Sequence, residues 1–242
     1  MSARAVILAG GKGSRLAPYT AVIPKPLMPL GDRPILDVVL RQLASHGFGR
    51  VTIAVGYLAH IIQAVLGDGS EQGVEIDYHM ETEPLGTAGP LATIAGHESL
   101  LAMNGDLLTD LDYGAFYAAH KESGNAMTVA VHRRTVTADY GVMDLEEGDT
   151  DVVQVTGYRE KPESQITVSM GVYAIEPEAL ELVPAGRFDI PDLVLKLLDQ
   201  GMGVGAYPFD GYWLDIGRHD DYDRAVAEFK DVLPRLLPGE AS

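Results

Sequence analysis

Runs of residues suited to buried strands alternate with runs suited to helices over residues 1–110, and this order constrains the fold more than any other feature of the chain. A strand, a crossover and a second strand in one sheet normally pair in parallel with a right-handed connection. The pattern therefore predicts an α/β fold with a mostly parallel, mixed sheet flanked by helices. The expected strands are 5–9, 51–55, 74–78 and 99–103, and the expected helices are 34–43, 58–66 and 87–96.

The second half of the chain has a different sequence pattern, with four runs of residues suited to strands and few runs suited to helices between them. Such runs predict a β-rich insertion that includes antiparallel strands and forms a second lobe. Because no Ser- or Pro-rich linker separates the halves, we expect one domain over 1–242, with halves 1–110 and 111–242. The extended runs are 127–132, 141–145, 152–156 and 166–175, and closing helices are expected at 177–183, 189–200 and 219–229.

The composition excludes several classes of protein. No apolar run approaches the roughly 20 residues that span a bilayer, and glycines and Lys12 interrupt the apolar N-terminus, so a cytoplasmic protein with no membrane partner is expected. The chain has no cysteine, which excludes disulfides and thiolate metal sites. Its histidines do not recur at the spacing of a zinc helix, so any metal must be held by oxygen atoms.

The net charge of −17 argues against a nucleic-acid partner, because phosphate backbones are bound by basic patches. A small anion can still bind where positive charge gathers locally. Four of the 18 basic residues fall in the first 25 positions, namely Arg4, Lys12, Arg15 and Lys25. The N-terminal loop is therefore predicted to be positive within a negative molecule.

A glycine loop with Gly10, Gly11 and Gly13 follows the first predicted strand, at a point where backbone could approach an anion closely. It is not a Walker A loop, since Val6 and Gly13 stand where that motif needs Gly and Ser or Thr. Leu16 replaces the third glycine of the dinucleotide fingerprint. By itself the loop is equally compatible with a plain turn.

Lys25 stands between Pro24 and Pro26. Prolines restrict their own backbone and that of the residue before them, so Ile23 and Lys25 are predicted to be extended and the lysine to point in one direction. A fixed ammonium is suited to the negative charge of a phosphorus atom during transfer. The alternative is an exposed lysine in a proline loop, and the nearby glycine loop favours the functional interpretation.

Two carboxylates are candidate metal ligands. Asp106 follows the strand expected at 99–103, where ligands bind in open α/β sheets, and Asp215 lies among apolar and aromatic residues. Mg²⁺ typically takes one or two carboxylates together with phosphate oxygens, so a convergence of the two would form a metal site. Separately, each has a plain interpretation: Asp106 as part of an Asn-Gly turn and Asp215 as a strand-end residue.

The segment 160–162, Glu-Lys-Pro, is a further charged motif within the β-rich half. Its spacing alone does not distinguish a functional site from a surface turn.

Seven motifs, in order along nearly the whole chain, resemble those of the sugar-1-phosphate nucleotidylyltransferases, also called NDP-sugar pyrophosphorylases. The segment 81–91 is most similar to the mannose- and heptose-1-phosphate guanylyltransferases. The resemblance implies a Rossmann-like sheet with a sugar-binding lobe, and the conversion of a nucleoside triphosphate and a sugar 1-phosphate to an NDP-sugar and pyrophosphate. The motifs are residues 8–16, 24–27, 83–89, 104–106, 140–141, 160–162 and 213–217.

Carried over residue by residue, the resemblance implies that Arg15 binds the β,γ-phosphates and that Lys25 stabilises the α-phosphorus, so these two are the expected catalytic residues. Asp106 and Asp215 correspond to the Mg²⁺ ligands. The residues expected to bind the nucleotide are Leu8, Ala9, Gly10, Gly11, Gly13, Ser14, Arg15, Lys25, Glu81, Pro84, Gly86, Thr87, Asn104, Gly105 and Asp106. Those expected to bind the sugar and its phosphate are Tyr140, Gly141, Glu160, Lys161 and Ser169.

Glu81 is the residue whose chemistry indicates which nucleobase is bound. A carboxylate accepts two hydrogen bonds side by side, and guanine offers adjacent N1 and N2 donors, whereas thymine and uracil present one donor beside an acceptor. GTP with a hexose or heptose 1-phosphate is therefore the first expectation. A thymidylyl-, uridylyl- or adenylyltransferase acting on glucose 1-phosphate stays open.

A catalytically silent sugar-nucleotide sensor is an alternative from another class. The presence of every charged residue that the reaction needs favours the enzyme. The chain lacks the β-helix that some relatives append after the transferase domain, so neither acetyltransferase activity nor that mode of regulation is expected. The expected partners are a nucleoside triphosphate and a sugar 1-phosphate, and a homo-oligomer stays open.

Overall fold

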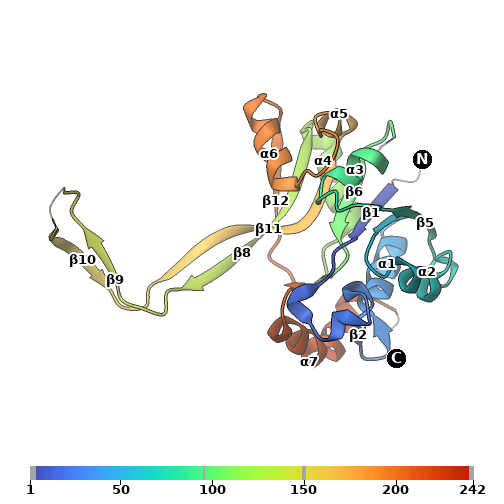
Figure 1. Ribbon diagram of the computed structural model, residues 1–242, viewed down its shortest axis with the longest axis horizontal. Coiled ribbons are helices and arrows are strands. Elements are labelled where there is room, and N and C mark those ends of the chain that lie inside the picture. Colours follow the sequence, from blue (N-terminus) through green and yellow to red (C-terminus); the bar gives the residue numbers. More distant parts are fainter. Residues whose placement is uncertain (1–3, 95, 149–150, 240–242) are drawn as a thin grey trace.

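A seven-stranded mixed sheet forms the centre of the protein, as seen in the computed structural model, which describes residues 4–94, 96–148 and 151–239 (Figure 1). β11 is antiparallel to both of its neighbours, and the other neighbouring pairs are parallel. The mostly parallel sheet predicted from the sequence is confirmed. In spatial order the strands are β12 (Val204–Pro208), β8 (Met127–Thr137), β11 (Glu163–Ile175), β6 (Leu100–Asn104), β1 (Arg4–Ala9), β4 (Arg50–Val55) and β5 (Glu75–Met80).

Helices cover both faces of this sheet because successive residues of each strand point to opposite sides. In β1, Ile7 belongs to the core shared with the first set of helices, and Val6 belongs to the core shared with the second. The first set is α1 (Ile35–Ser45), α2 (Ala59–Leu66) and α4 (Tyr113–Ser123). The second set is α3 (Gly89–Ile94), α5 (Pro177–Leu180) and α6 (Ile190–Asp199).

The last helix, α7 (His219–Leu236), packs on a third core with Leu16, Met28 and Leu214. Within the described parts of the chain, no helix has both the length and the apolar character needed to cross a bilayer. The remaining short elements are the strands β2 (Pro29–Leu30), β3 (Arg33–Pro34), β7 (Leu107–Thr109) and β13 (Trp213–Asp215), and the 3₁₀ turns η1 (Ser14–Leu16), η2 (Tyr19–Ala21), η3 (Lys25–Leu27) and η4 (Ser70–Gln72).

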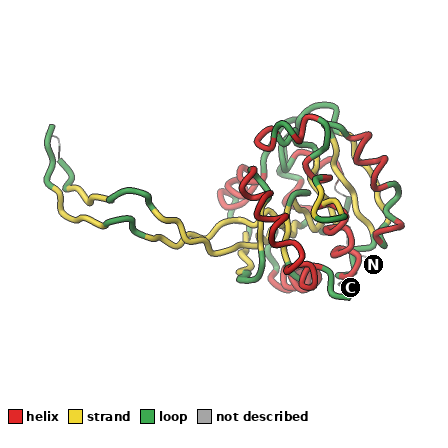
Figure 2. Tube along the Cα trace, turned by 90° about the horizontal axis from the view of Figure 1, so that it is seen from below, coloured by secondary structure: helices red, strands yellow, loops and turns green. Residues whose placement is uncertain are grey.

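Beyond the sheet, β8 and β11 continue as a two-stranded ribbon that ends in β9 (Val142–Leu145) and β10 (Val155–Arg159). We call the described residues of 133–167 the arm, and the rest of the protein the body. The arm projects away from the body in two perpendicular views (Figures 1 and 2). Of the extended runs expected in the second half, 127–132 and most of 166–175 lie in the central sheet, in β8 and β11. The runs 141–145 and 152–156 correspond to β9 and β10 at the end of the arm, so these antiparallel strands form an extended ribbon instead of a packed lobe.

Some element boundaries differ from the prediction. The strand expected at 152–156 is β10, which begins three residues later. The helix expected at 177–183 ends at Leu180, whereas the one expected at 219–229 continues to Leu236. The differences arise because apolar character marks the middle of an element better than its end.

The helix α4 is absent from the sequence-based prediction, although its ends carry ordinary signals. Asp112 Oδ1 accepts a hydrogen bond from the backbone N–H of Ala115 at 2.9 Å, and Gly124 ends the helix with φ of 67°. Tyr113, Phe116 and His120 are spaced for one face and are buried. The N-cap, the terminal glycine and this spacing together could have identified the helix.

We expect Asp112→Ala to lower the free energy of unfolding by about 1 kcal/mol, because the N-terminal amides of α4 lose their side-chain acceptor. Asp112→Asn keeps an N-cap acceptor and is the matched control. Urea denaturation of both variants and the parent protein measures the effect. Equal stability of the alanine and asparagine variants would show that the cap does not stabilise α4.

Candidate active site

A cavity of about 470 Å³ opens at the carboxyl ends of β1 and β6. The chain passes from β1 to β4 on one side and later returns to β6 on the other, and such a switch point is where open α/β sheets bind ligands. Every residue expected to bind the nucleotide lines this cavity. The lining also includes Pro26, Arg187 and Asp189, which the sequence analysis did not select.

The glycine loop packs directly against the segment that carries Lys25. Gly13 has φ of 60°, and a Cβ there would lie 2.9 Å from Thr20 Cγ2 and 3.1 Å from Lys25 Cβ. The Thr20 hydroxyl donates a hydrogen bond to the Gly13 carbonyl at 2.9 Å. Glycine is therefore required at this position for both its backbone conformation and its space.

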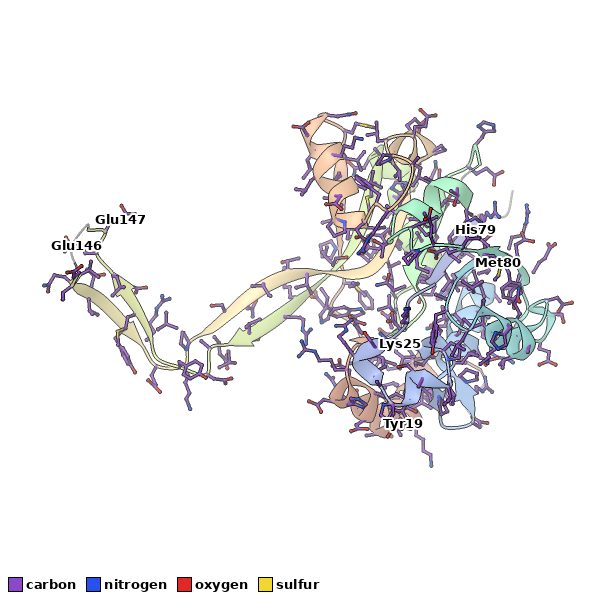
Figure 3. All side chains as sticks on the ribbon, viewed as in Figure 1. Tyr19, Lys25, His79, Met80, Glu146 and Glu147 are labelled. Carbon is purple, nitrogen blue, oxygen red and sulfur yellow. The ribbon has the colours of Figure 1, made fainter. Side chains whose placement is uncertain are left out.

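Lys25 begins the 3₁₀ turn η3, so the prediction of an extended backbone at this residue is wrong. The turn forms because the N–H of Leu27 donates to the carbonyl of Pro24 at 2.8 Å. The lysine is nevertheless only 8% exposed, and its ammonium forms an ion pair with the Asp106 carboxylate. Burial and this ion pair, and not an extended backbone, hold the side chain in one direction. Figure 3 labels Lys25 within the body of the protein.

Asp106 and Asp215 lie side by side because β13 pairs with β7. Asp215 is opposite Leu107 in this ladder, and the N–H of Ile216 donates to the carbonyl of Asp106 at 3.2 Å. Asp215 keeps contact with solvent, but partial desolvation at the edge of the site raises its pKa, and the negative charge of Asp106 raises it further. Lys25 and Arg15 act on the same pKa in the opposite direction, so the four charged groups share one electrostatic environment.

The two carboxylates fit a hard divalent cation that completes its shell with phosphate oxygens. Within the described residues, no group of three or more His, Cys, Asp or Glu side chains is placed to hold a metal.

Arg15 lies in η1, and its side chain is exposed. A Cβ added at Gly217 would lie 3.5 Å from the Arg15 Nη1 atom. Since Gly217 follows β13, the guanidinium is near the Asp215 end of the site. Lys25 and Arg15 both line the cavity and bring two positive charges to it.

Glu81 faces the glycine loop from the end of β5. A Cβ added at Gly10 would lie 2.4 Å from the Glu81 Oε1 atom, so only glycine leaves room for this carboxylate. Its Oε2 atom accepts a hydrogen bond from the backbone N–H of Leu85 at 3.3 Å. Burial raises the pKa of Glu81.

The wall opposite the glycine loop joins two segments that are distant in sequence. Asp189 Oδ1 accepts hydrogen bonds from the Thr87 backbone N–H at 2.9 Å and from the Thr87 hydroxyl at 3.3 Å. The carbonyl of Phe188 accepts from the N–H of Ala88 at 2.9 Å. Arg187, whose Nη2 atom is 3.6 Å from Asp189 Oδ2, brings a third cation to the cavity. No motif marks 187–189, and the sequence analysis assigned this segment only the start of the helix expected at 189–200.

None of the five residues expected to bind the sugar and its phosphate lines this cavity. Tyr140, Gly141, Glu160 and Lys161 are in the arm and do not line the cavity. Ser169 lies where the arm meets the body, and its hydroxyl donates to the Tyr173 hydroxyl at 3.2 Å.

Within the arm, Tyr158 lies close to two of the sugar candidates, Gly141 and Glu160. The Tyr158 hydroxyl donates a hydrogen bond to the Glu160 carboxylate, and a Cβ at Gly141 would lie 2.3 Å from the same hydroxyl oxygen. Lys161 has φ of 42°, in the left-handed region that non-glycine residues seldom adopt. The arm therefore presents Glu160 and Lys161 at a sharply defined bend.

Comparisons with known proteins agree with this architecture. A protein-family model described as "Nucleotidyl transferase" matches residues 4–231. The UTP–glucose-1-phosphate uridylyltransferase of Synechocystis sp. is 32% identical, and the match covers 97% of this chain and 64% of that protein. The mannose-1-phosphate guanylyltransferase of Mycobacterium tuberculosis is 30% identical, and the match covers 98% of this chain and 66% of that protein. The chain thus spans about two thirds of the length of these relatives.

Solved structures share the fold. HddC from Yersinia pseudotuberculosis is 26% identical with a TM-score of 0.72, and the match covers 94% of this chain and 99% of that one. A second structure of HddC, complexed with GMP-PN, is 24% identical with a TM-score of 0.71, and the match again covers 94% of this chain and 99% of that one.

Proposed function

Because the chain belongs to the nucleotidyl transferase family, we propose that it transfers a nucleotidyl group from a nucleoside triphosphate to a sugar 1-phosphate and releases pyrophosphate. The observation that carries this proposal is the buried Lys25 ammonium, paired with Asp106 beside the glycine loop and close to Asp215. In the proposed arrangement residues 1–242 act as one transferase domain, with the nucleotide in the cavity at the ends of β1 and β6.

The proposed reaction is a single in-line displacement. A phosphate oxygen of the sugar 1-phosphate attacks the α-phosphorus, and the bond from that phosphorus to the oxygen bridging it to the β-phosphate breaks. Pyrophosphate leaves with the bond's electron pair, so no covalent protein intermediate is needed. Lys25 neutralises charge that develops on the α-phosphoryl oxygens, and Arg15 binds the β,γ-phosphates.

Asp106 and Asp215 are the residues that would hold Mg²⁺. When bound, a divalent cation supplies charge neutralisation for the phosphates. The protein contributes the paired carboxylates and keeps the Lys25 ammonium beside them.

GTP is the proposed nucleotide, and Glu81 supports it. The Oε2 atom of Glu81 is engaged by the Leu85 N–H at a long 3.3 Å, whereas Oε1 points toward the loop at Gly10. A carboxylate in this position suits the adjacent N1 and N2 donors of guanine. The relatives include both a guanylyltransferase and a uridylyltransferase, so the base requires a direct measurement.

We expect Glu81→Gln to lower kcat/KM for GTP about 10-fold relative to UTP or dTTP, because the amide replaces one acceptor with a donor that faces a donor of guanine. The measurement is pyrophosphate release with each nucleotide at saturating sugar 1-phosphate. Glu83→Gln is the matched control, since Glu83 is close in sequence and does not line the cavity. An unchanged preference in Glu81→Gln would contradict the base assignment.

The proposed function as a whole is tested with a grid of five nucleoside triphosphates against common sugar 1-phosphates in the presence of Mg²⁺. The expected result is pyrophosphate release for a small set of pairs, with GTP and a hexose or heptose 1-phosphate among them. Binding of a sugar nucleotide without pyrophosphate release from any pair would favour the silent sensor and overturn the proposal.

A further inference from the structure

A second cavity, of about 480 Å³, adjoins the nucleotide cavity at Arg15. Its lining comprises Arg15, Arg218, His219 and Asp220. The last three of these residues are exposed, and none of them lines the nucleotide cavity. The second cavity therefore shares one wall with the nucleotide cavity and is otherwise open to solvent.

The fold places Arg218 beside Arg15, although the two are far apart in sequence. The Arg15 Nη1 atom lies 3.5 Å from the position that a Cβ would take at Gly217, so this guanidinium packs against the backbone just before Arg218. Gly217 follows β13, and Arg218 precedes α7. The second cavity is therefore formed where the strand that carries Asp215 passes into the last helix.

His219 ties the start of α7 to the segment that follows Arg15. Its Nε2 atom donates a hydrogen bond to the carbonyl of Ala17 at 2.9 Å, because a carbonyl oxygen can only accept. The ring of Tyr19 packs beside the imidazole with the ring centroids 5.8 Å apart. Figure 1 shows α7 beside the blue N-terminal segment. These contacts keep Arg15 and Arg218 on the walls of one cavity.

The positive charge of this cavity is not neutralised by ion pairs. Within the described parts of the chain, neither the Arg15 nor the Arg218 guanidinium forms an ion pair with a carboxylate. Arg224, one turn further along α7, does form one, with Glu228 at 2.8 Å. Two guanidiniums left without a carboxylate in a chain of net charge −17 favour an anionic ligand between them.

We propose that the second cavity is the exit site of inorganic pyrophosphate, which Arg15 and Arg218 bind together as it leaves the nucleotide cavity. This inference rests on the proposed function, because that reaction supplies pyrophosphate as its product. Arginine is suited to the role, since its planar guanidinium donates paired hydrogen bonds to phosphate oxygens.

The chemistry of the transfer explains why a second arginine would serve the product more than the substrate. When the bond to the α-phosphorus breaks, the bridging oxygen becomes a terminal oxygen of pyrophosphate, and the negative charge on these two phosphates increases. A triphosphate in the nucleotide cavity meets Arg15 but not Arg218, because Arg218 does not line that cavity. The pyrophosphate gains the second guanidinium only as it moves outward.

The reverse reaction measures the exit site directly, because pyrophosphate must then enter through it. A pyrophosphate oxygen attacks the nucleoside-linked phosphorus of the NDP-sugar, the sugar 1-phosphate leaves, and a nucleoside triphosphate forms. We expect Arg218→Ala to raise the KM for pyrophosphate about 10-fold, the usual order for one lost charge-assisted hydrogen bond at an exposed site. The KM for the NDP-sugar, and that for the triphosphate in the forward direction, should change by less than about 2-fold.

Two further variants control the measurement, which uses the NDP-sugar formed fastest in the substrate grid. Arg224→Ala also removes one arginine from the start of α7, but Arg224 lines neither cavity, and it should keep the wild-type KM for pyrophosphate. Asp220→Asn removes the carboxylate from the lining and should lower that KM about 2-fold, because a repulsive charge is lost. A purely structural role of this region would not lower the KM. Thermal unfolding of each variant checks that the fold is kept.

The outcomes separate this inference from the proposed function. An active wild type, together with an unchanged KM for pyrophosphate in Arg218→Ala, would overturn the exit site and leave the function intact. Equal rises in the KM values for pyrophosphate and for the triphosphate would make Arg218 a ligand of the bound nucleotide and also overturn it. Wild-type protein that is inactive across the substrate grid would overturn the function, and the exit site with it.

Discussion

Replacing Lys25 with alanine is expected to slow pyrophosphate release by about 10²–10³-fold, the usual cost of removing one fixed group that stabilises developing charge. The ammonium is buried and paired with Asp106, so it needs little reorganisation when charge builds on the α-phosphoryl group. The loss should appear in kcat, because the charge that Lys25 meets develops during the reaction.

Lys12→Ala is the matched control for Lys25→Ala, because it also removes one lysine side chain. Lys12 belongs to the same glycine loop, but it is exposed and does not line the cavity. We expect near-wild-type turnover from this variant, and thermal unfolding of both variants checks that the fold is kept. A folded Lys25→Ala variant with near-wild-type pyrophosphate release would remove Lys25 from the mechanism.

Replacing Asp106 with asparagine is expected to reduce turnover by at least about 10²-fold, since neutralising phosphate charge with a held metal ion contributes several kcal/mol to such transfers. The change keeps the size of the side chain, removes a candidate Mg²⁺ ligand and deprives Lys25 of its anionic partner. The measurement is pyrophosphate release over a Mg²⁺ titration.

Asp32→Asn controls for the loss of one negative charge, because Asp32 lies exposed in the turn between β2 and β3. The metal role predicts that Asp106→Asn needs a higher Mg²⁺ concentration for half-maximal rate, whereas Asp32→Asn does not. An unchanged Mg²⁺ dependence together with a slow rate would leave Asp106 as a partner of Lys25 alone and contradict its role as a ligand.

The location of the cavity at the ends of β1 and β6 could be predicted from the sequence because the fold brings strand ends together. β1 and β6 are adjacent and parallel, so the glycine loop after Ala9 and the turn that carries Asp106 emerge at the same edge. The approach of Asp215 to Asp106 depends on the short ladder between β13 and β7, and no sequence pattern predicts the pairing of these two three-residue strands.

Other features depend on contacts that local patterns do not encode. The 3₁₀ turn at Lys25 is determined by hydrogen bonds to neighbouring backbone, and these outweigh the extended preference of a residue before proline. Arg187 and Asp189 reach the cavity because Phe188 and Asp189 bind the segment 87–89 across the fold. The direction of the arm follows from how two long strands leave the sheet, which strand propensity alone does not determine.

The narrow attachment of the arm has a consequence for how such enzymes diversify. The arm joins the body only through β8 and β11, so a replacement needs two junctions, near Arg133 and Thr167. If recognition of the acceptor resides in the transplanted ribbon, a chimaera would change which glycosyl phosphate is used while it kept its preference among nucleobases. Donor and acceptor choice would then evolve as separate modules.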